Sequence, residues 1–243
     1  MQHSDTTELP RSRAVRDEDK RERSHAILDA AERLLSTAPD RVSIMADVAA
    51  AAGVAKGTVY LYFPSKEALL LALHDRHCEG FFEAMLARLR EPAPLTMAQM
   101  NAIVRERITA HAAYLPCASV CFGYDRTMPL APMQEHMHRV MNWLDATAHG
   151  LHAHLPRLTH TEAIVLLRRS YALMLGLWQL LKPEMQARIV SQFTGSGSEA
   201  AKFCQAEYVG EVEASLVTLW TPYFAVRDAK PAAQNEPFLR NIS

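Results

Sequence analysis

The sequence predicts an all-α protein, and its composition and periodicity support this prediction. Glycine is scarce, with 9 copies in 243 residues, while good helix formers such as alanine, leucine, methionine and glutamate are abundant. Apolar residues return every three or four positions over most of the chain, which is the period of a helix with one buried face. A hydrophobic content of 49% and a charged content of 22% are typical of a globular protein with a sizeable core.

The N-terminal part is expected to contain three helices separated by residues that break helices. Ser43 can cap the second helix through its side-chain oxygen, and Gly53 allows the tight turn between the second helix and the third. Together the helices form a first domain over residues 19–65. The expected segments are a polar disordered tail (1–18), a helix from 19 to the break at Pro39, a helix from Ser43 to about 52, and a helix at 56–62 that Pro64 stops.

The rest of the chain is expected to form a larger helical domain over residues 66–228. Ser65 can cap a long helix that runs from 66 to near 90, where Pro92 and Pro94 end it. The residues after 228 are rich in proline and asparagine and are expected to form a flexible tail (229–243). Further helices are expected at about 96–115, 129–154, 160–182, 184–193 and 199–223.

Three residues of the first domain have the spacing of a helix-turn-helix. Ala49 is small enough to let two helices approach closely, Gly53 permits the sharp turn, and Val59 packs between the helices. This arrangement would leave the helix at 56–62 exposed and able to enter the major groove of DNA. Because the formal net charge of the chain is −1, the argument for DNA rests on this local pattern and not on overall basicity.

The stretch VSIMADVAAAAGVAKGTVYLYFPSKEALLLAL, residues 42–73, resembles the DNA-binding signature of the tetracycline-repressor (TetR) family. The resemblance covers roughly residues 20–73 and is densest at GVAKGTVYLYFPSKEAL. It implies a DNA-binding regulator with a C-terminal domain for ligand binding and dimerisation. Carried onto this sequence, it implies DNA contacts from Ser43, Lys56, Gly57, Thr58, Tyr60, Tyr62 and Lys66.

These positions have physically sensible roles. Gly57 allows close approach to the groove floor, and Thr58 offers a hydroxyl and a methyl to a base edge. Tyr60 and Tyr62 are expected to reach phosphates, as is Lys66 in the first turn of its helix. One departure is that many family members carry polar or basic residues where this chain has Ile44 and Ala46. The tail arginines, Arg11, Arg13 and Arg16, are either a DNA-binding arm or part of a solvated tail.

The resemblance also implies an effector cavity and a dimer. Methionine and aromatic side chains suit an adaptable apolar pocket, although an ordinary core is the alternative for any one of them. Dimerisation is expected through the helices at 160–182 and 199–223, packed with the same helices of a second copy. The candidate pocket residues are Phe81, Met85, His111, Tyr114, Cys121, Phe122, Met141, Tyr171, Met174 and Trp178.

The function predicted is a cytoplasmic, homodimeric regulator that leaves a palindromic operator in double-stranded DNA when a small-molecule effector binds. The polar N-terminus and the short apolar runs predict no membrane partner. The histidines at 136–160 do not have a recognised metal-ligand spacing, so neither a metal site nor a cofactor is predicted. No catalytic motif is found either. The alternatives are a helical small-molecule binding protein without DNA specificity and an all-helical enzyme, and activation remains open beside repression.

Overall fold

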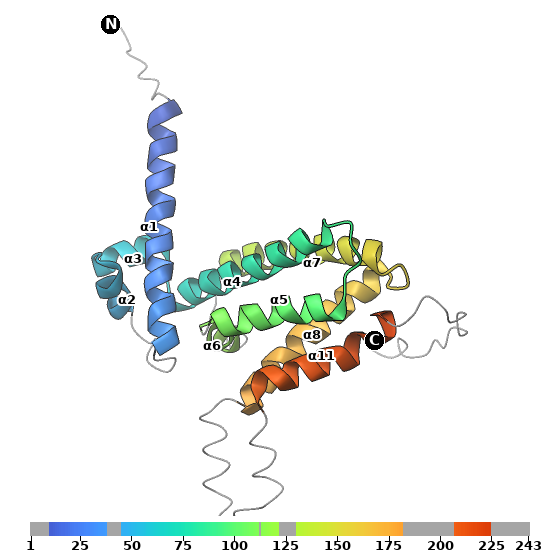
Figure 1. Cartoon of the computed structure of the whole chain (residues 1–243). Helices are drawn as coiled ribbons and strands as arrows, with labels where there is room; N and C mark the ends of the chain where they lie inside the picture. The colour runs from blue at the N-terminus through green and yellow to red at the C-terminus, as the bar shows by residue number, and fades with distance from the viewer. Residues whose placement is uncertain (1–9, 38–44, 112, 122–129, 182–206, 225–243) are drawn as a thin grey trace, which may run out of the picture.

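The computed structural model describes residues 10–37, 45–111, 113–121, 130–181 and 207–224, which fold as helices and short connections without a strand. The all-α prediction is therefore confirmed (Figure 1). The helices are α1 (Pro10–Thr37), α2 (Met45–Ala52), α3 (Lys56–Tyr62), α4 (Lys66–Leu89), α5 (Met97–Ala110), α6 (Tyr114–Cys121), α7 (Leu130–His154), α8 (His160–Leu181) and α11 (Tyr208–Phe224).

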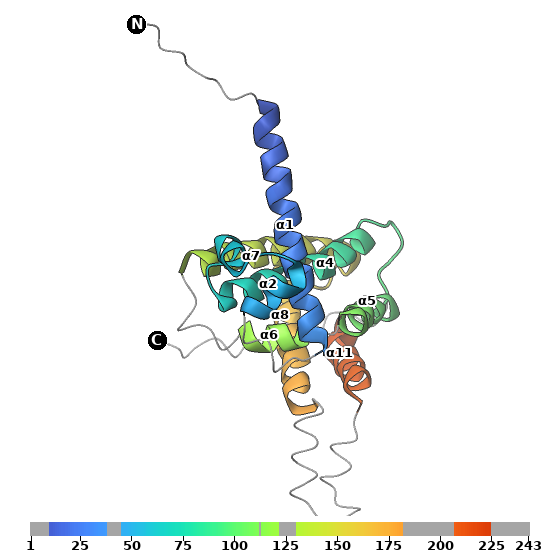
Figure 2. The same cartoon turned by 90° about the vertical axis from the view of Figure 1, so that its left-hand side faces the viewer.

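The first helix is longer than the sequence pattern predicts, because α1 begins at Pro10 and not near residue 19. No proline or glycine interrupts the chain between Pro10 and Thr37, and arginine, lysine and glutamate are good helix formers. A proline is also favoured at the first position of a helix, where its missing N–H is not needed. The N-terminal half of α1 stands clear of the other helices in both views (Figures 1 and 2).

The first three helices share one hydrophobic core with the beginning of α4. Ile27, Val48 and Val59 come from α1, α2 and α3, and each is at most 1% exposed. Leu70 and Leu73 of α4 pack into the same core. The N-terminal domain is thus completed by a helix that continues into the second domain.

Helix α4 is the structural link between the two domains. It begins at the predicted cap, where the Ser65 side chain accepts a hydrogen bond from the backbone N–H of Ala68 at 3.1 Å. Its second half leaves the N-terminal core and contributes Phe82, Met85 and Leu89 to the core of the larger domain. Any tilt of α4 would therefore change both cores together.

Helix α6 lies between the helices expected at about 96–115 and 129–154, where the sequence analysis names no helix. Pro116 stands in the first turn of α6, where backbone N–H groups have no partner within the helix, so the proline is tolerated there. The Cys117 thiol donates a hydrogen bond to the backbone oxygen of Leu70, 3.0 Å away. This contact seats α6 against α4 at the boundary of the two domains.

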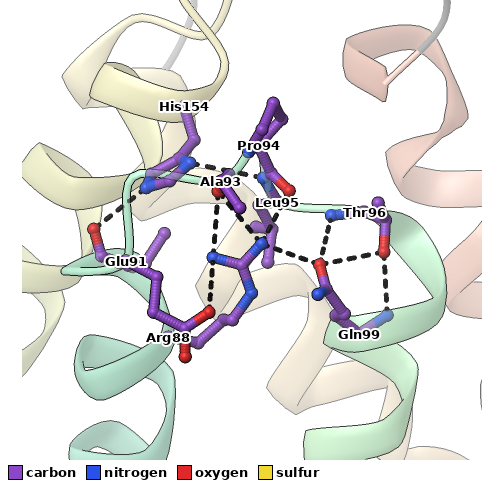
Figure 3. A network of polar contacts seen from close by, with 9 residues as sticks. Arg88, Glu91, Ala93, Pro94, Leu95, Thr96, Gln99 and His154 are labelled. Atoms are coloured by element: carbon purple, nitrogen blue, oxygen red, sulfur yellow. Dashed lines mark hydrogen bonds and ion pairs between the residues drawn. The ribbon is translucent and has the colours of Figure 1, made fainter.

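The far end of α4 is held by a polar network (Figure 3). The buried Arg88 guanidinium donates hydrogen bonds to the backbone oxygens of Ala93 and Pro94 and to the Gln99 side chain. His154, at the end of α7, bonds the Leu89 oxygen at 2.9 Å through Nε2 and accepts from the Leu95 N–H at 3.3 Å through Nδ1. The turn from α4 to α5 is thereby fixed to α7.

The remaining helices form the body of the larger domain. Helix α7 packs against α4 and α8, and α11 packs against α5 and α8. Trp220 of α11 is 1% exposed, and its indole N–H donates to the Ser170 hydroxyl at 2.8 Å. The predicted helix at 184–193 lies outside the described residues, and the one predicted at 199–223 is described from Tyr208 onward.

One described helix, α8, has the length and apolar composition that a membrane span would need, with a mean hydropathy of 1.3 over 18 residues. This single helix is weak support for a membrane span, because core helices of soluble proteins pass the same test. Within one copy of the chain, only 22% of this 18-residue stretch of α8 is buried. Part of the remaining surface lines the cavity described below, and Leu180 near the end of α8 is 50% exposed at the outside.

Candidate DNA-binding surface and ligand cavity

Helices α2 and α3 form a helix-turn-helix with the geometry that the sequence predicts. Gly53 adopts a φ of 68°, which favours glycine over other residues. The backbone N–H of Val54 bonds the oxygen of Ala49 at 3.0 Å and closes the turn. Ala49 is 3% exposed and Val59 is fully buried between the helices, so each of the three residues fills its expected structural position.

The outer face of α3 carries most of the predicted DNA contacts. Lys56, Gly57 and Tyr60 are exposed, whereas Thr58 is half-buried. The Lys56 ammonium lies 5.9 Å from the centre of the Tyr60 ring, a cation–π distance that holds both side chains on one face. This short helix contains no acidic residue, so its exposed face is locally positive.

The other predicted contacts lie around this face. Lys66 is half-buried in the first turn of α4, and the half-buried Tyr62 packs partly against the N-terminal core. Ser43 and Ile44 lie outside the described residues. The sequence analysis did not single out Leu61, which is 83% exposed at the end of α3. An exposed leucine between two tyrosines offers an apolar contact, such as a thymine methyl group would accept.

The larger domain encloses a cavity of about 880 Å³. Its wall is mostly apolar and combines side chains of α4, α6, α7 and α8, which pack around one another in Figure 2. Cavities of this size and character are typical of small-molecule sites. Five of the candidate pocket residues line the cavity, namely Phe81, Tyr114, Met141, Tyr171 and Met174.

The other candidate pocket residues lie elsewhere or are not described. Met85 is 1% exposed within the solid core, and Trp178 packs against Tyr208 of α11 with ring centres 5.5 Å apart. His111 ends α5 and faces Glu32 of the N-terminal domain at 3.4 Å. These candidates rested on residue type and on the family resemblance, and neither indicates which side of the core a side chain faces. The Phe122 residue and the Cys121 side chain lie outside the described parts of the chain.

The cavity has a polar corner that the sequence analysis did not identify. His74 of α4 lines it and shares a hydrogen bond of 2.7 Å with the Tyr171 hydroxyl. Burial, together with a smaller contribution from the neighbouring His136, lowers the pKa of His74 to about 4. His74 is therefore neutral at pH 7, which suits a group that must lie in an apolar wall. The signal in the sequence was one of two histidines in a leucine-rich helix, which alone did not indicate this position.

An ion-pair cluster stands beside this corner. The Asp75 carboxylate on α4 accepts hydrogen bonds from His136 and Arg139 of α7. Burial raises the pKa of Asp75, but the hydrogen bonds and the charges of His136 and Arg139 together outweigh it, so the pKa lies below its usual value. The cluster connects α4 and α7 along the edge of the cavity. A ligand that moves either helix would have to change these contacts.

The N-terminal domain resembles known regulators in sequence. Residues 27–73 match the family model described as "Bacterial regulatory proteins, tetR family". The chain is 46% identical over 68 residues to the HTH-type transcriptional regulator EthR of Mycobacterium tuberculosis, covering 28% of this chain and 32% of that protein. It is 36% identical over 74 residues to the fatty acid metabolism regulator protein of Bacillus subtilis, covering 30% and 38%. The matched stretch thus spans about a third of the length of these relatives.

A solved structure covers more of the chain at lower identity. The fatty acid degradation regulator FadR from Bacillus halodurans is 19% identical, with a TM-score of 0.48, and covers 80% of this chain and 96% of its own. The assignment itself rests on the N-terminal domain, where the matched residues coincide with the helix-turn-helix and with the first turns of α4. The N-terminal helix-turn-helix domain of this chain is thus similar to the DNA-binding domain of the TetR family of bacterial regulatory proteins.

Proposed function

We propose that this regulator binds palindromic double-stranded DNA as a homodimer and that a small molecule in the cavity lowers its affinity for that DNA. The observation that carries the proposal is the exposed face of α3, with Lys56, Gly57 and Tyr60 free of core contacts beside the buried Val59. Such a helix presents donors, a hydroxyl and positive charge where a major groove would meet them. No catalytic step is part of this proposal.

The dimer is supported by apolar surface on two long helices. Leu180 of α8 is 50% exposed and Val217 of α11 is 40% exposed, and the two helices pack side by side. A second copy applied through a two-fold axis would cover this surface and form a four-helix bundle. Two recognition helices placed about 34–36 Å apart would then read the two halves of a palindrome.

The coupling between ligand and DNA is expected to pass through α4. The polar network around Arg88 and His154 fixes the C-terminal end of this helix. Its middle lines the cavity through His74 and Phe81, and its N-terminal end carries Lys66. A ligand that displaces the middle would therefore move the N-terminal end, and the recognition helices would change their separation.

The proposal is tested by selection from random duplex DNA at fixed salt concentration. The expected result is enrichment of a palindrome by the wild type and loss of that enrichment in Thr58→Ala and Lys66→Ala. Arg90→Ala is the matched control, because it removes one exposed positive charge at the opposite end of α4. Binding that is sensitive to salt but indifferent to sequence would overturn the proposal and favour a small-molecule binding protein without DNA specificity.

The DNA site obtained from this selection also allows a test of whether the effector lowers or raises DNA affinity. A library of amphipathic small molecules is added to the complex, and compounds that occupy the cavity are expected to lower DNA affinity. Met141→Trp is expected to lower the affinity of the protein for these compounds. Met141 lines the cavity and is 48% exposed, so the larger tryptophan side chain can extend into the space that a compound would occupy. Compounds that bind the cavity and tighten DNA binding would contradict release by the effector.

A further inference from the structure

Three metal-ligating side chains meet at the junction between the two domains. Glu32 comes from α1 of the N-terminal domain, His77 from the middle of α4, and His111 from the end of α5. These side chains are far apart in the sequence and belong to three different helices. They lie outside the cavity, and neither the helix-turn-helix nor the ligand site requires them.

The donor atoms are spaced as metal ligands are. Glu32 Oε1 lies 3.7 Å from His77 Nε2 and 3.4 Å from His111 Nδ1, and all three atoms are within 4.8 Å of one another. Ligand bonds of about 2.0–2.2 Å in a tetrahedral zinc site place neighbouring donor atoms roughly 3.3–3.5 Å apart. Small side-chain adjustments would bring the three atoms to that geometry.

The state of His77 points to a ligand at this place. Its side chain is 2% exposed, and the buried Nε2 has no hydrogen-bond partner in the described parts of the chain. The nearest carboxylate oxygen, Oε1 of Glu32, is too distant for a hydrogen bond. A buried ring nitrogen without a partner is costly, and coordination of an ion would satisfy it.

The carboxylate is already oriented for this role. Arg76 binds the other Glu32 oxygen, Oε2, and also pairs with Asp29, both on α1. Oε1 is left facing the two histidines. A second group that fixes a ligating carboxylate in this way is a usual feature of protein metal sites.

Two other clusters of possible ligands are less suited to a metal ion. In the cluster of His74, Asp75 and His136, the His74 Nε2 already shares a hydrogen bond with the Tyr171 hydroxyl, and both Asp75 oxygens already accept hydrogen bonds. In the other cluster, His149 directs Nδ1 at a backbone oxygen of its own helix, 2.8 Å away, and its side chain is 68% exposed. The junction cluster is therefore the best candidate.

We propose that Glu32, His77 and His111 bind one divalent transition-metal ion, with Zn²⁺ as the expected species, and that this ion joins the DNA-binding domain to the effector domain. Two histidines and one glutamate are a known zinc ligand set that leaves a fourth position for water. Because the ligands come from α1, α4 and the end of α5, the ion favours one orientation of the N-terminal domain over others. The ion is then a second input to the regulator, separate from the effector in the cavity.

The test is a Zn²⁺ titration of the full, tag-free, metal-stripped chain against a chromophoric chelator. The expected result is one site per chain, with an affinity that falls in Glu32→Gln and in His111→Ala by at least the roughly 10- to 100-fold that loss of an outer-shell partner costs. His111 is partly exposed, so its variant is expected to fold, and circular dichroism verifies this. His149→Ala is the matched control, because it removes a histidine from the exposed cluster and should leave this affinity unchanged.

A Co²⁺ spectrum provides the second readout. Co²⁺ in the wild type is expected to give the visible bands of a four-coordinate site without the charge-transfer band of thiolate ligands, and these bands should be lost in His111→Ala. Absence of tight Zn²⁺ binding, or affinity unchanged in both Glu32→Gln and His111→Ala, would overturn the proposal. The DNA selection is performed in chelating buffer, so failure of the metal site and failure of the proposed function are observed separately.

Discussion

The two domains differ in how their interiors are filled, and this difference explains what each can do. The N-terminal core is solid, with Ile27, Ala31, Val59 and Leu73 all at 0% exposure. The larger domain instead keeps about 880 Å³ of space between its helices. A helix that must fit a groove of fixed width benefits from a rigid support, whereas a site for a small molecule needs room and adaptable side chains.

Helix α4 belongs to both kinds of interior. Its first turns lie in the solid core, and its middle turns face the cavity. A change in the hollow domain can thus reach the solid one without an additional linking element. The following predictions test this difference between the solid N-terminal core and the cavity-containing domain, from the largest expected effect to the smallest.

The largest expected effect is the loss of Trp220, which supports the hollow domain from one side. Trp220→Ala should lower the free energy of unfolding by about 3–5 kcal/mol, because it removes a fully buried ring and its hydrogen bond to Ser170. Met141→Ala, at the cavity wall, should cost less than about 1 kcal/mol. Denaturant unfolding measures both. If the two variants lost the same free energy of unfolding, Met141 would be as tightly packed as Trp220, and the cavity beside it would be filled in solution.

The next effect concerns pH and the polar corner of the cavity. The pKa of His74 is about 4 in the folded protein and 6.5 in the unfolded chain. As the pH falls below 6.5, the unfolded state takes up a proton that folded His74 does not, so stability is lost down to pH 4. The loss attributable to this histidine is up to about 3 kcal/mol.

The contribution of His74 is isolated by comparison with His74→Gln, in which the amide can still bond the Tyr171 hydroxyl. The groups that face His74 are Asp75, His77, Cys78, Tyr114, His136 and Tyr171, and all of them remain in the variant. Thermal melts of both proteins between pH 7 and 4 measure the difference. If His74→Gln lost as much stability at low pH as the wild type, groups other than His74 would account for the acid sensitivity.

The two domains also differ in what the sequence reveals. In the helix-turn-helix, each short-range requirement has its own residue, such as Gly53 for the turn and Val59 for the contact between helices, so the geometry was predictable. The cavity wall instead depends on long-range packing. Met85 and Met174 have similar patterns in the sequence, but Met85 is packed inside the core of the larger domain and Met174 lines the cavity. The junction of Glu32, His77 and His111 depends on three distant segments and had no local signal.

A smaller effect is expected at the DNA-binding surface, where substitutions at two residues should change DNA binding in different ways. Thr58→Ala should relax sequence preference by about 1–3 kcal/mol, because its side chain is expected on a base edge. Lys66→Ala should weaken binding to all sequences and reduce the slope of log affinity against log salt by about 1 per subunit. Fluorescence anisotropy across a salt series separates the two. A specificity change in Lys66→Ala would place that residue on a base.

The smallest expected change in stability concerns Gly53 and Gly57, two glycines with open space around them. A Cβ at either Gly53 or Gly57 would meet no atom within 4 Å, so neither substitution causes a clash inside the protein. Gly53 has a φ of 68°, and Gly53→Ala should therefore destabilise the fold by about 1 kcal/mol. Gly57 lies in regular helix, and Gly57→Ala should stabilise it by up to about 1 kcal/mol.

The same pair separates folding from DNA binding. If Gly57 is needed for close approach to the groove floor, Gly57→Ala should weaken binding to the selected palindrome even though its free energy of unfolding rises. The loss of affinity then has no explanation in the protein alone and must arise at the contact with DNA. A Gly57→Ala variant that is more stable and binds DNA as well as the wild type would show that α3 meets the groove through its other residues.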